Sequence, residues 1–87
     1  MELFVLRTAE GWQQGGGAAV VIAETLARVQ SLMREYELED SLTVYESDAD
    51  AEADVSGPFR HAWVQVETFP TTEERERIVL ISWDEKI

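Results

Sequence analysis

One segment of the chain has the hydrophobic period of an α-helix, and every other apolar segment is short. In residues 24–38 the apolar side chains recur at steps of three and four, at Leu26, Val29, Met33 and Tyr36. Thr25 or Glu24 is the candidate N-cap of this helix. Because one amphipathic helix covers only one face of a sheet, the chain is limited to a small helix-on-sheet fold.

Five further segments have strand character, because they are rich in β-branched and aromatic residues or alternate apolar with polar ones. They are residues 2–8, 18–23, 41–46, 61–69 and 75–84. The glycines at 15–17 favour a hairpin turn between the first two of these strands. Residues 70–74 are expected to form a loop or a single helical turn. We expect one domain, residues 1–87, with an α+β fold. It has a mostly antiparallel sheet of four or five strands and one main helix on one face, in the order β-β-α-β-β-β.

The strands carry more apolar side chains than one helix can bury. In residues 75–84, strict alternation predicts Ile78 and Leu80 on one face, with Val79, Ile81 and Trp83 on the other. In residues 61–69 it predicts Val64 on one face, opposite Trp63, Glu67 and Phe69. The excess is either covered by the acidic segment or the glycine loop, or forms a contact surface for a second copy or another protein.

Charge and residue content exclude several classes of function. The net charge of −11 repels nucleic acid and anionic membranes and attracts basic protein surfaces. Cysteine is absent, His61 is the single histidine, and no serine lies in a G-x-S-x-G elbow. We therefore expect no enzyme activity, no cofactor and no metal site. The chain start does not resemble a signal peptide and the longest apolar run is too short for a membrane span, which favours a cytoplasmic protein.

The most unusual stretch is SDADAEAD, residues 47–54. A calcium loop of the EF-hand type is disfavoured, because Ala53 stands where glycine is required and Phe59 where the closing glutamate is required. A short helix capped by Ser47 or Asp48, or a solvated loop, is the favoured structure. An extended edge would instead place the carboxylates about 6.6 Å apart, much as phosphates follow one another along a strand. Solubility alone is the fourth interpretation.

We expect a non-catalytic binding protein, an inhibitor or adaptor, that docks its acidic region on a basic surface of a partner, such as a nucleic-acid-binding enzyme. The candidate contact residues are Glu46, Asp48, Asp50, Glu52 and Asp54, with Glu37, Glu39 and Asp40 adding to the field and Trp12, Trp63 and Trp83 as apolar anchors. The alternative is a small accessory domain that self-associates as a homodimer through the uncovered sheet face. Its acidity would then reflect only host adaptation or solubility.

In its brevity, its acidity and its α+β build without catalytic apparatus, the chain resembles inhibitors of nucleic-acid-handling defence proteins encoded by phages or mobile elements, including some anti-CRISPR proteins. The resemblance lies in properties of the whole chain and in no motif, so it assigns a role to no single residue. It implies the same general kind of function, inhibition of a partner protein, whereas the interpretation of the acids as a nucleic-acid mimic comes from their spacing in residues 47–54.

Overall fold

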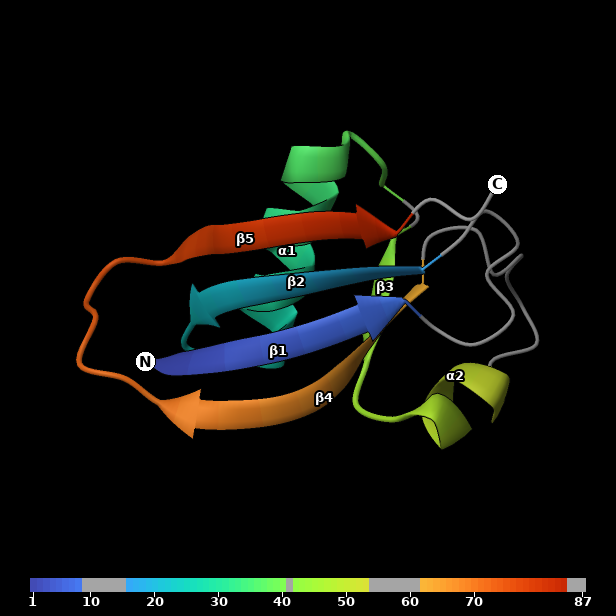
Figure 1. Ribbon diagram of the computed structural model, residues 1–87, viewed down its shortest axis with the longest axis horizontal. Coiled ribbons are helices and arrows are strands. Elements are labelled where there is room, and N and C mark those ends of the chain that lie inside the picture. The colour runs from blue at the N-terminus through green and yellow to red at the C-terminus, as the bar shows by residue number, and fades with distance from the viewer. Residues whose placement is uncertain (9–15, 41, 54–61, 85–87) are drawn as a thin grey trace.

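The computed structural model of the protein describes residues 1–8, 16–40, 42–53 and 62–84. Within these residues, five strands form one sheet of order β3-β4-β1-β2-β5, and helix α1 packs on one face (Figure 1). The elements are β1 (Glu2–Thr8), β2 (Gly16–Ala23), α1 (Leu26–Glu37), β3 (Thr43–Tyr45), α2 (Asp48–Ala53), β4 (Ala62–Pro70) and β5 (Arg77–Asp84). The predicted α+β class and order of the main elements are confirmed.

The sheet is mixed. β1 pairs antiparallel with β2 and β4, and β2 pairs antiparallel with β5, whereas β3 runs parallel to β4. Two parallel neighbours need a crossover connection of about a dozen residues or more. The chain between β3 and β4 contains the acidic stretch and α2, so the acidic stretch belongs to this crossover.

Helix α1 begins at a residue that the sequence suggested. Thr25 has an extended backbone, and its hydroxyl oxygen accepts a hydrogen bond from the backbone N–H of Arg28 at 3.2 Å, which makes it the N-cap. The Glu76 carboxylate binds the Arg28 guanidinium, with a shortest N–O distance of 3.0 Å, and accepts the N–H of Glu24 at 3.3 Å. These hydrogen bonds lower the pKa of Glu76 and tie the start of α1 to the loop before β5.

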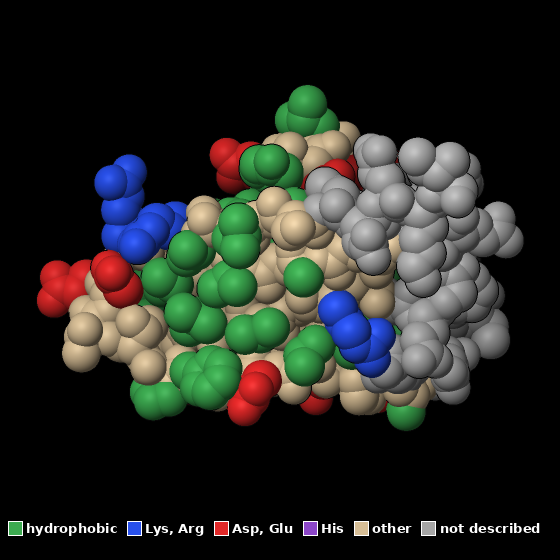
Figure 2. Space-filling view, in the orientation of Figure 1, with side chains coloured by type: hydrophobic (Ala, Val, Ile, Leu, Met, Phe, Trp, Pro, Cys, Tyr) green, Lys and Arg blue, Asp and Glu red, His purple; other side chains and the backbone are tan. Residues whose placement is uncertain are grey.

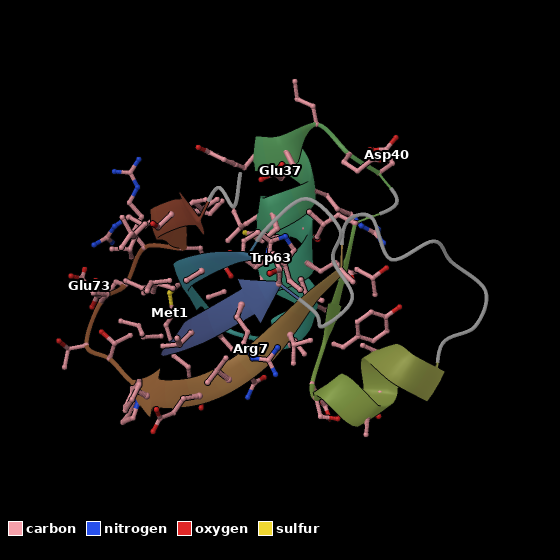
Figure 3. The ribbon with its side chains drawn as sticks, turned by 45° about the vertical axis from the view of Figure 1, so that its right-hand side comes forward. Met1, Arg7, Glu37, Asp40, Trp63 and Glu73 are labelled. Atoms are coloured by element: carbon pink, nitrogen blue, oxygen red, sulfur yellow. The ribbon has the colours of Figure 1, made fainter. Side chains whose placement is uncertain are left out.

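The main core lies between the sheet and α1. Its buried members come from β1, β2, β3, β4, α1 and the position before β3: Phe4, Leu6, Ala19, Val21, Ala23, Val29, Met33, Leu42, Val44 and Trp63. The Trp63 side chain is 0% exposed and lies on the α1 side of the sheet (Figure 3). The expectation that Trp63 is an apolar anchor for a partner is therefore wrong, because its side chain is already committed to the core.

A second, smaller cluster lies on the other face of the sheet. Ala51 of α2 packs there with Ala62, Val64 and Tyr45. Ser47 caps α2, because its hydroxyl oxygen accepts the N–H of Asp50 at 3.2 Å and its O–H donates to the Asp50 carboxylate at 3.0 Å. The favoured short helix is confirmed for residues 48–53, and the extended edge is wrong there.

Register shifts in β4 and β5 overturn the strict alternation that the sequence predicted. Val21 pairs with Ile78 and Val20 with Leu80, so that Val79 is an extra residue. Since Ile78 and Ile81 both pack against the main core, Val79 and Leu80 both face away from α1. The predicted pairing of Ile78 with Leu80 on one face is wrong.

Strand β4 has the same irregularity. Leu6 pairs with Gln65 and Val5 with Glu67, which leaves Val66 as the extra residue. Beyond this bulge, Glu67 and Phe69 lie on the face opposite α1, together with Val64. The prediction that separated them from Val64 is wrong, because a bulge reverses the faces of every residue that follows it.

Part of the glycine cluster belongs to a strand. Gly16 and Gly17 open β2 and pair with Asp84 and Trp83, and the Gly17 N–H donates to the Thr8 hydroxyl at 3.1 Å. The turn expected at 15–17 is thus wrong for these two positions, and residues 9–15 lie outside the described chain. The segment 71–76 is a loop. Neither α1 nor α2 has the length and hydrophobicity that a bilayer-spanning helix needs.

Candidate functional site

The end of α1 has an unusual conformation. Its C-cap residue, Leu38, has φ 54° and ψ 41°, in the left-handed region, and the N–H groups of Leu38 and Glu39 both donate to the carbonyl of Arg34. Glycine is the usual residue there, because a side chain in this region costs about 1 kcal/mol or more. The Leu38 side chain is 90% exposed, so hydrophobic burial does not offset this strain.

Acidic residues surround this leucine. We define the acidic helix end as residues 35–40. It comprises four acids and the two exposed apolar residues between them: Glu35, Tyr36, Glu37, Leu38, Glu39 and Asp40. Tyr36 is 60% exposed, although its spacing predicted it on the buried face of the helix. Figure 3 shows Glu37 and Asp40 together at this end of the molecule.

The electrostatics of the acidic helix end are strongly negative. The carboxylates lie where the helix dipole already places a negative partial charge, an arrangement that does not favour helix stability. Arg34 is the basic residue of the last turn, and its Nε donates to the Leu42 carbonyl at 2.6 Å. Four acids against this one arginine leave a local charge of −3. A cationic partner would relieve the repulsion between them.

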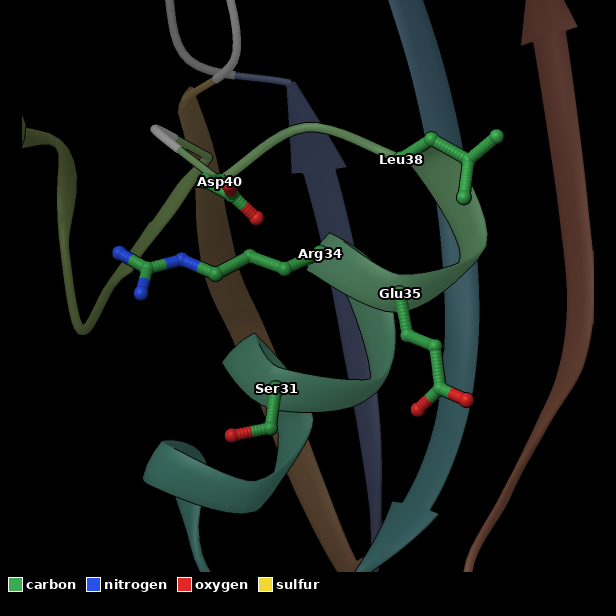
Figure 4. A pocket seen from close by; sticks show the side chains of 5 residues that line it. All are labelled: Ser31, Arg34, Glu35, Leu38 and Asp40. Carbon is green, nitrogen blue, oxygen red and sulfur yellow. The ribbon is translucent and has the colours of Figure 1, made fainter.

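A shallow hollow open to solvent accompanies these charges (Figure 4). It is lined by Ser31, Arg34, Glu35, Leu38 and Asp40. Arg34 extends from the helix toward β3, whereas Leu38 points outward from the turn that follows the helix (Figure 4). The hollow can receive the tip of a partner's side chain beside Leu38, but it does not enclose a ligand.

The acids of 46–54 form a second, separate group. Glu46 and Asp50 are exposed, and Asp48 and Glu52 belong to α2, although the positions of their side chains are not described. Strand β3 separates α2 from the acidic helix end (Figures 1 and 3), and its three residues span roughly 10 Å. Because charges are screened over about 8 Å at physiological salt, the single acidic region of the sequence becomes two surfaces.

The other predicted site residues divide as follows. Trp12 and Asp54 lie outside the described residues. The backbone of Trp83, in β5, pairs with that of Gly17 in β2, but the position of the Trp83 side chain is not described. The structure thus brings Glu37, Glu39 and Asp40 together at one helix end, and it separates them from Glu46 and Asp50.

Sequence reasoning missed Leu38 as a site residue. It sits in LED, directly after the helical period ends, and no glycine stands nearby to terminate the helix. The absence of a glycine at the end of the helical pattern was the available signal that another residue must adopt the left-handed conformation there. The Arg28–Glu76 pair had no such signal, because its members are 48 residues apart.

In the described part of the chain, no group of three or more histidine, cysteine, aspartate or glutamate side chains could hold a metal ion. Comparisons with protein-family models, with curated proteins and with solved structures gave no match.

Proposed function

We propose that this protein is a non-catalytic binding protein that docks its acidic helix end on a basic surface of a partner protein. The observation that carries the proposal is an exposed leucine, held in a strained left-handed conformation, with four acids within three residues of it in the sequence. Two of these acids, Glu35 and Asp40, line the same hollow as the leucine. Strain without compensating burial is characteristic of functional positions. Here it fixes Leu38 so that its side chain points away from the molecule.

In this mode of binding, Leu38 and Tyr36 supply the apolar contact and the carboxylates surround it. Binding energy in interfaces is concentrated in a few central apolar or aromatic side chains, while the charged rim governs specificity and rate of encounter. The net charge of −11 would speed encounter with a basic surface. The α2 acids would reach a second site on an extended basic surface.

A partner that holds DNA or RNA on its basic surface fits this description best. Such a surface is already adapted to closely spaced negative charges, so an acidic protein docked there would exclude the nucleic acid. The protein would then act as an inhibitor. Competition between this protein and a nucleic acid for the captured partner would support this form of the proposal.

The test compares two double variants of equal charge by affinity capture. Glu37→Lys/Asp40→Lys alters the acidic helix end, and Glu2→Lys/Glu74→Lys alters exposed acids elsewhere. Each replaces two acids by two lysines, which changes the net charge by +4, from −11 to −7. We expect a basic protein to be retained by the wild type and the control but lost from the helix-end variant, and retention to fall as salt is raised.

Two outcomes contradict the proposal. One is equal loss of capture by both variants, which would show that only overall charge matters. The other is capture that survives the helix-end variant and high salt. A third variant, Glu46→Lys/Glu52→Lys, has the same net charge and tests the second acidic group, for which we expect a smaller loss because it lacks an apolar anchor.

A further inference from the structure

Within residues 1–8, 16–40, 42–53 and 62–84, the sheet face opposite α1 is apolar and largely uncovered. We call it the open face. Its half-buried and exposed apolar members come from β1, β2, β4 and β5: Leu3, Val5, Val20, Val66, Phe69, Val79 and Leu80. Ile22, on the same face, is buried. Helix α2 covers only the corner at Ala62 and Val64. Figure 2 shows hydrophobic side chains spread across the front of the sheet.

The two bulges enlarge this exposed surface. They turn Val66 and Val79 outward next to Phe69 and Leu80, and these four side chains are 54, 49, 44 and 58% exposed, respectively. Contiguous apolar patches on soluble monomers rarely exceed a few hundred Å², and larger ones mark interaction sites. Four strands of about seven residues give the open face a flat area of roughly 450 Å².

This area suits a small dimer interface. A standard interface takes about 800 Å² of accessible surface from each partner, and the accessible surface of a sheet covered by side chains exceeds its flat area. Two sheets packed face to face, about 10 Å apart, are a common way to bury such faces.

The charge over the strands of the open face suits a second copy. These strands carry Arg7, Glu67 and Arg77, and Arg77 is paired with Glu73 at 3.4 Å. These four side chains sum to zero, in a chain whose net charge is −11. A second copy approaching through the acidic helix end would meet strong repulsion, whereas over these strands it meets much less, because the acids of α2 lie at a corner of the face.

We propose that a second copy of this chain packs on the open face, forming a two-layer sandwich of two sheets with one α1 on each outer side. A two-fold axis parallel to the strands, between β1 and β2, sets β4 of one copy against β5 of the other. Glu67, in β4 of each copy, then faces the strand that carries Arg77, β5 of the other copy. The dimer leaves both acidic helix ends exposed, so it is independent of the proposed partner binding.

The mass in solution tests this proposal. Sedimentation equilibrium from micromolar to submillimolar concentrations should show a transition from 9.9 kDa to 19.8 kDa, twice the chain mass. Leu80→Lys should weaken the dimer by about tenfold or more, because it places a charge in the apolar contact between β5 of one copy and β4 of the other. The matched control is Leu38→Lys, the same change at another exposed leucine, and it should leave the dimer intact while removing partner capture.

Salt and charge exchange identify a second copy as the occupant. Higher salt should strengthen the dimer, because it screens the repulsion between two chains of charge −11, whereas it should weaken docking to a basic partner. Glu67→Arg should weaken the dimer, and the double variant Glu67→Arg/Arg77→Glu should restore it. Circular dichroism of each variant confirms that the fold is retained.

A protein that stays at 9.9 kDa throughout this range overturns the proposal and assigns the open face to a different occupant. So does a dimer that Leu80→Lys leaves unchanged, since it must use another surface. Neither result affects the partner-capture experiment, so the two proposals fail separately.

Discussion

Replacing Leu38 by glycine should stabilise the fold, which is an unusual outcome for removal of a large apolar side chain. Leu38 has φ 54° and is 90% exposed. Relief of the left-handed strain contributes about 1.5 kcal/mol. Against this, the greater freedom of glycine in the unfolded chain costs about 0.7 kcal/mol, and the small buried part of the side chain contributes about 0.2 kcal/mol. The free energy of unfolding should rise by about 0.6 kcal/mol.

The assay is thermal and urea unfolding followed by circular dichroism. For a domain of this size the expected gain corresponds to a rise in Tm of about 2–5 °C, with an unchanged urea m value. Leu38→Ala is the control, because alanine keeps the Cβ atom that causes the strain and should change the stability by less than about 0.3 kcal/mol. Both variants should lose partner capture, since both lack the anchor.

Two results would refute this reasoning. If Leu38→Gly destabilises the protein, the leucine makes contacts that outweigh its strain. If Leu38→Ala stabilises as much as Leu38→Gly, the backbone at this position is not the source of the effect. A more stable protein that binds less well would show that the strained leucine is retained for binding.

Further expectations concern the two contacts that fasten the helices. Ala51→Glu should destabilise the fold by about 2 kcal/mol or more, because it forces a carboxylate into the contact of α2 with β4, whereas Ala49→Glu, the same change at an exposed position of the same helix, should be nearly neutral in urea unfolding. Glu76→Gln should flatten the dependence of Tm on pH. Because Arg28 lowers the folded-state pKa of Glu76 below 4.5, this glutamate contributes stability that is present above about pH 4.5 and is lost as the pH falls through the lowered pKa. Glu74→Gln, the same change at an exposed glutamate of the same loop, is the control. A Glu76→Gln profile identical to wild type would contradict the role of the pair.

The acidic stretch of 47–54 has a structural explanation that its composition conceals. Its alanines are the part that packs, through Ala51, and Ser47 with Asp50 closes the helix N-terminus. The helix lies in the crossover that a parallel β3–β4 pair needs. The acids of this helix are therefore explained by a helix that packs through one side and is hydrated on the other. For this reason we base the proposed binding mainly on the acidic helix end.

Local sequence signals determined the elements of this protein. The three- and four-residue period of Leu26, Val29 and Met33 defined α1, and Thr25 marked its start. These are properties of neighbouring residues, which a reader of the sequence can evaluate one segment at a time. The helical state of 48–53 followed in the same way from its alanines and its serine cap.

Contacts between distant segments decided the rest. A bulge depends on how two strands fit together, so nothing within RIVLISWD reveals that Val79 and Leu80 share a face. The parallel placement of β3 beside β4 divided one acidic stretch of sequence into two surfaces. The burial of Trp63 and the exposure of Leu38 were likewise fixed by what packs nearby, because the same apolar side chain serves as core or as contact surface according to its neighbours in space.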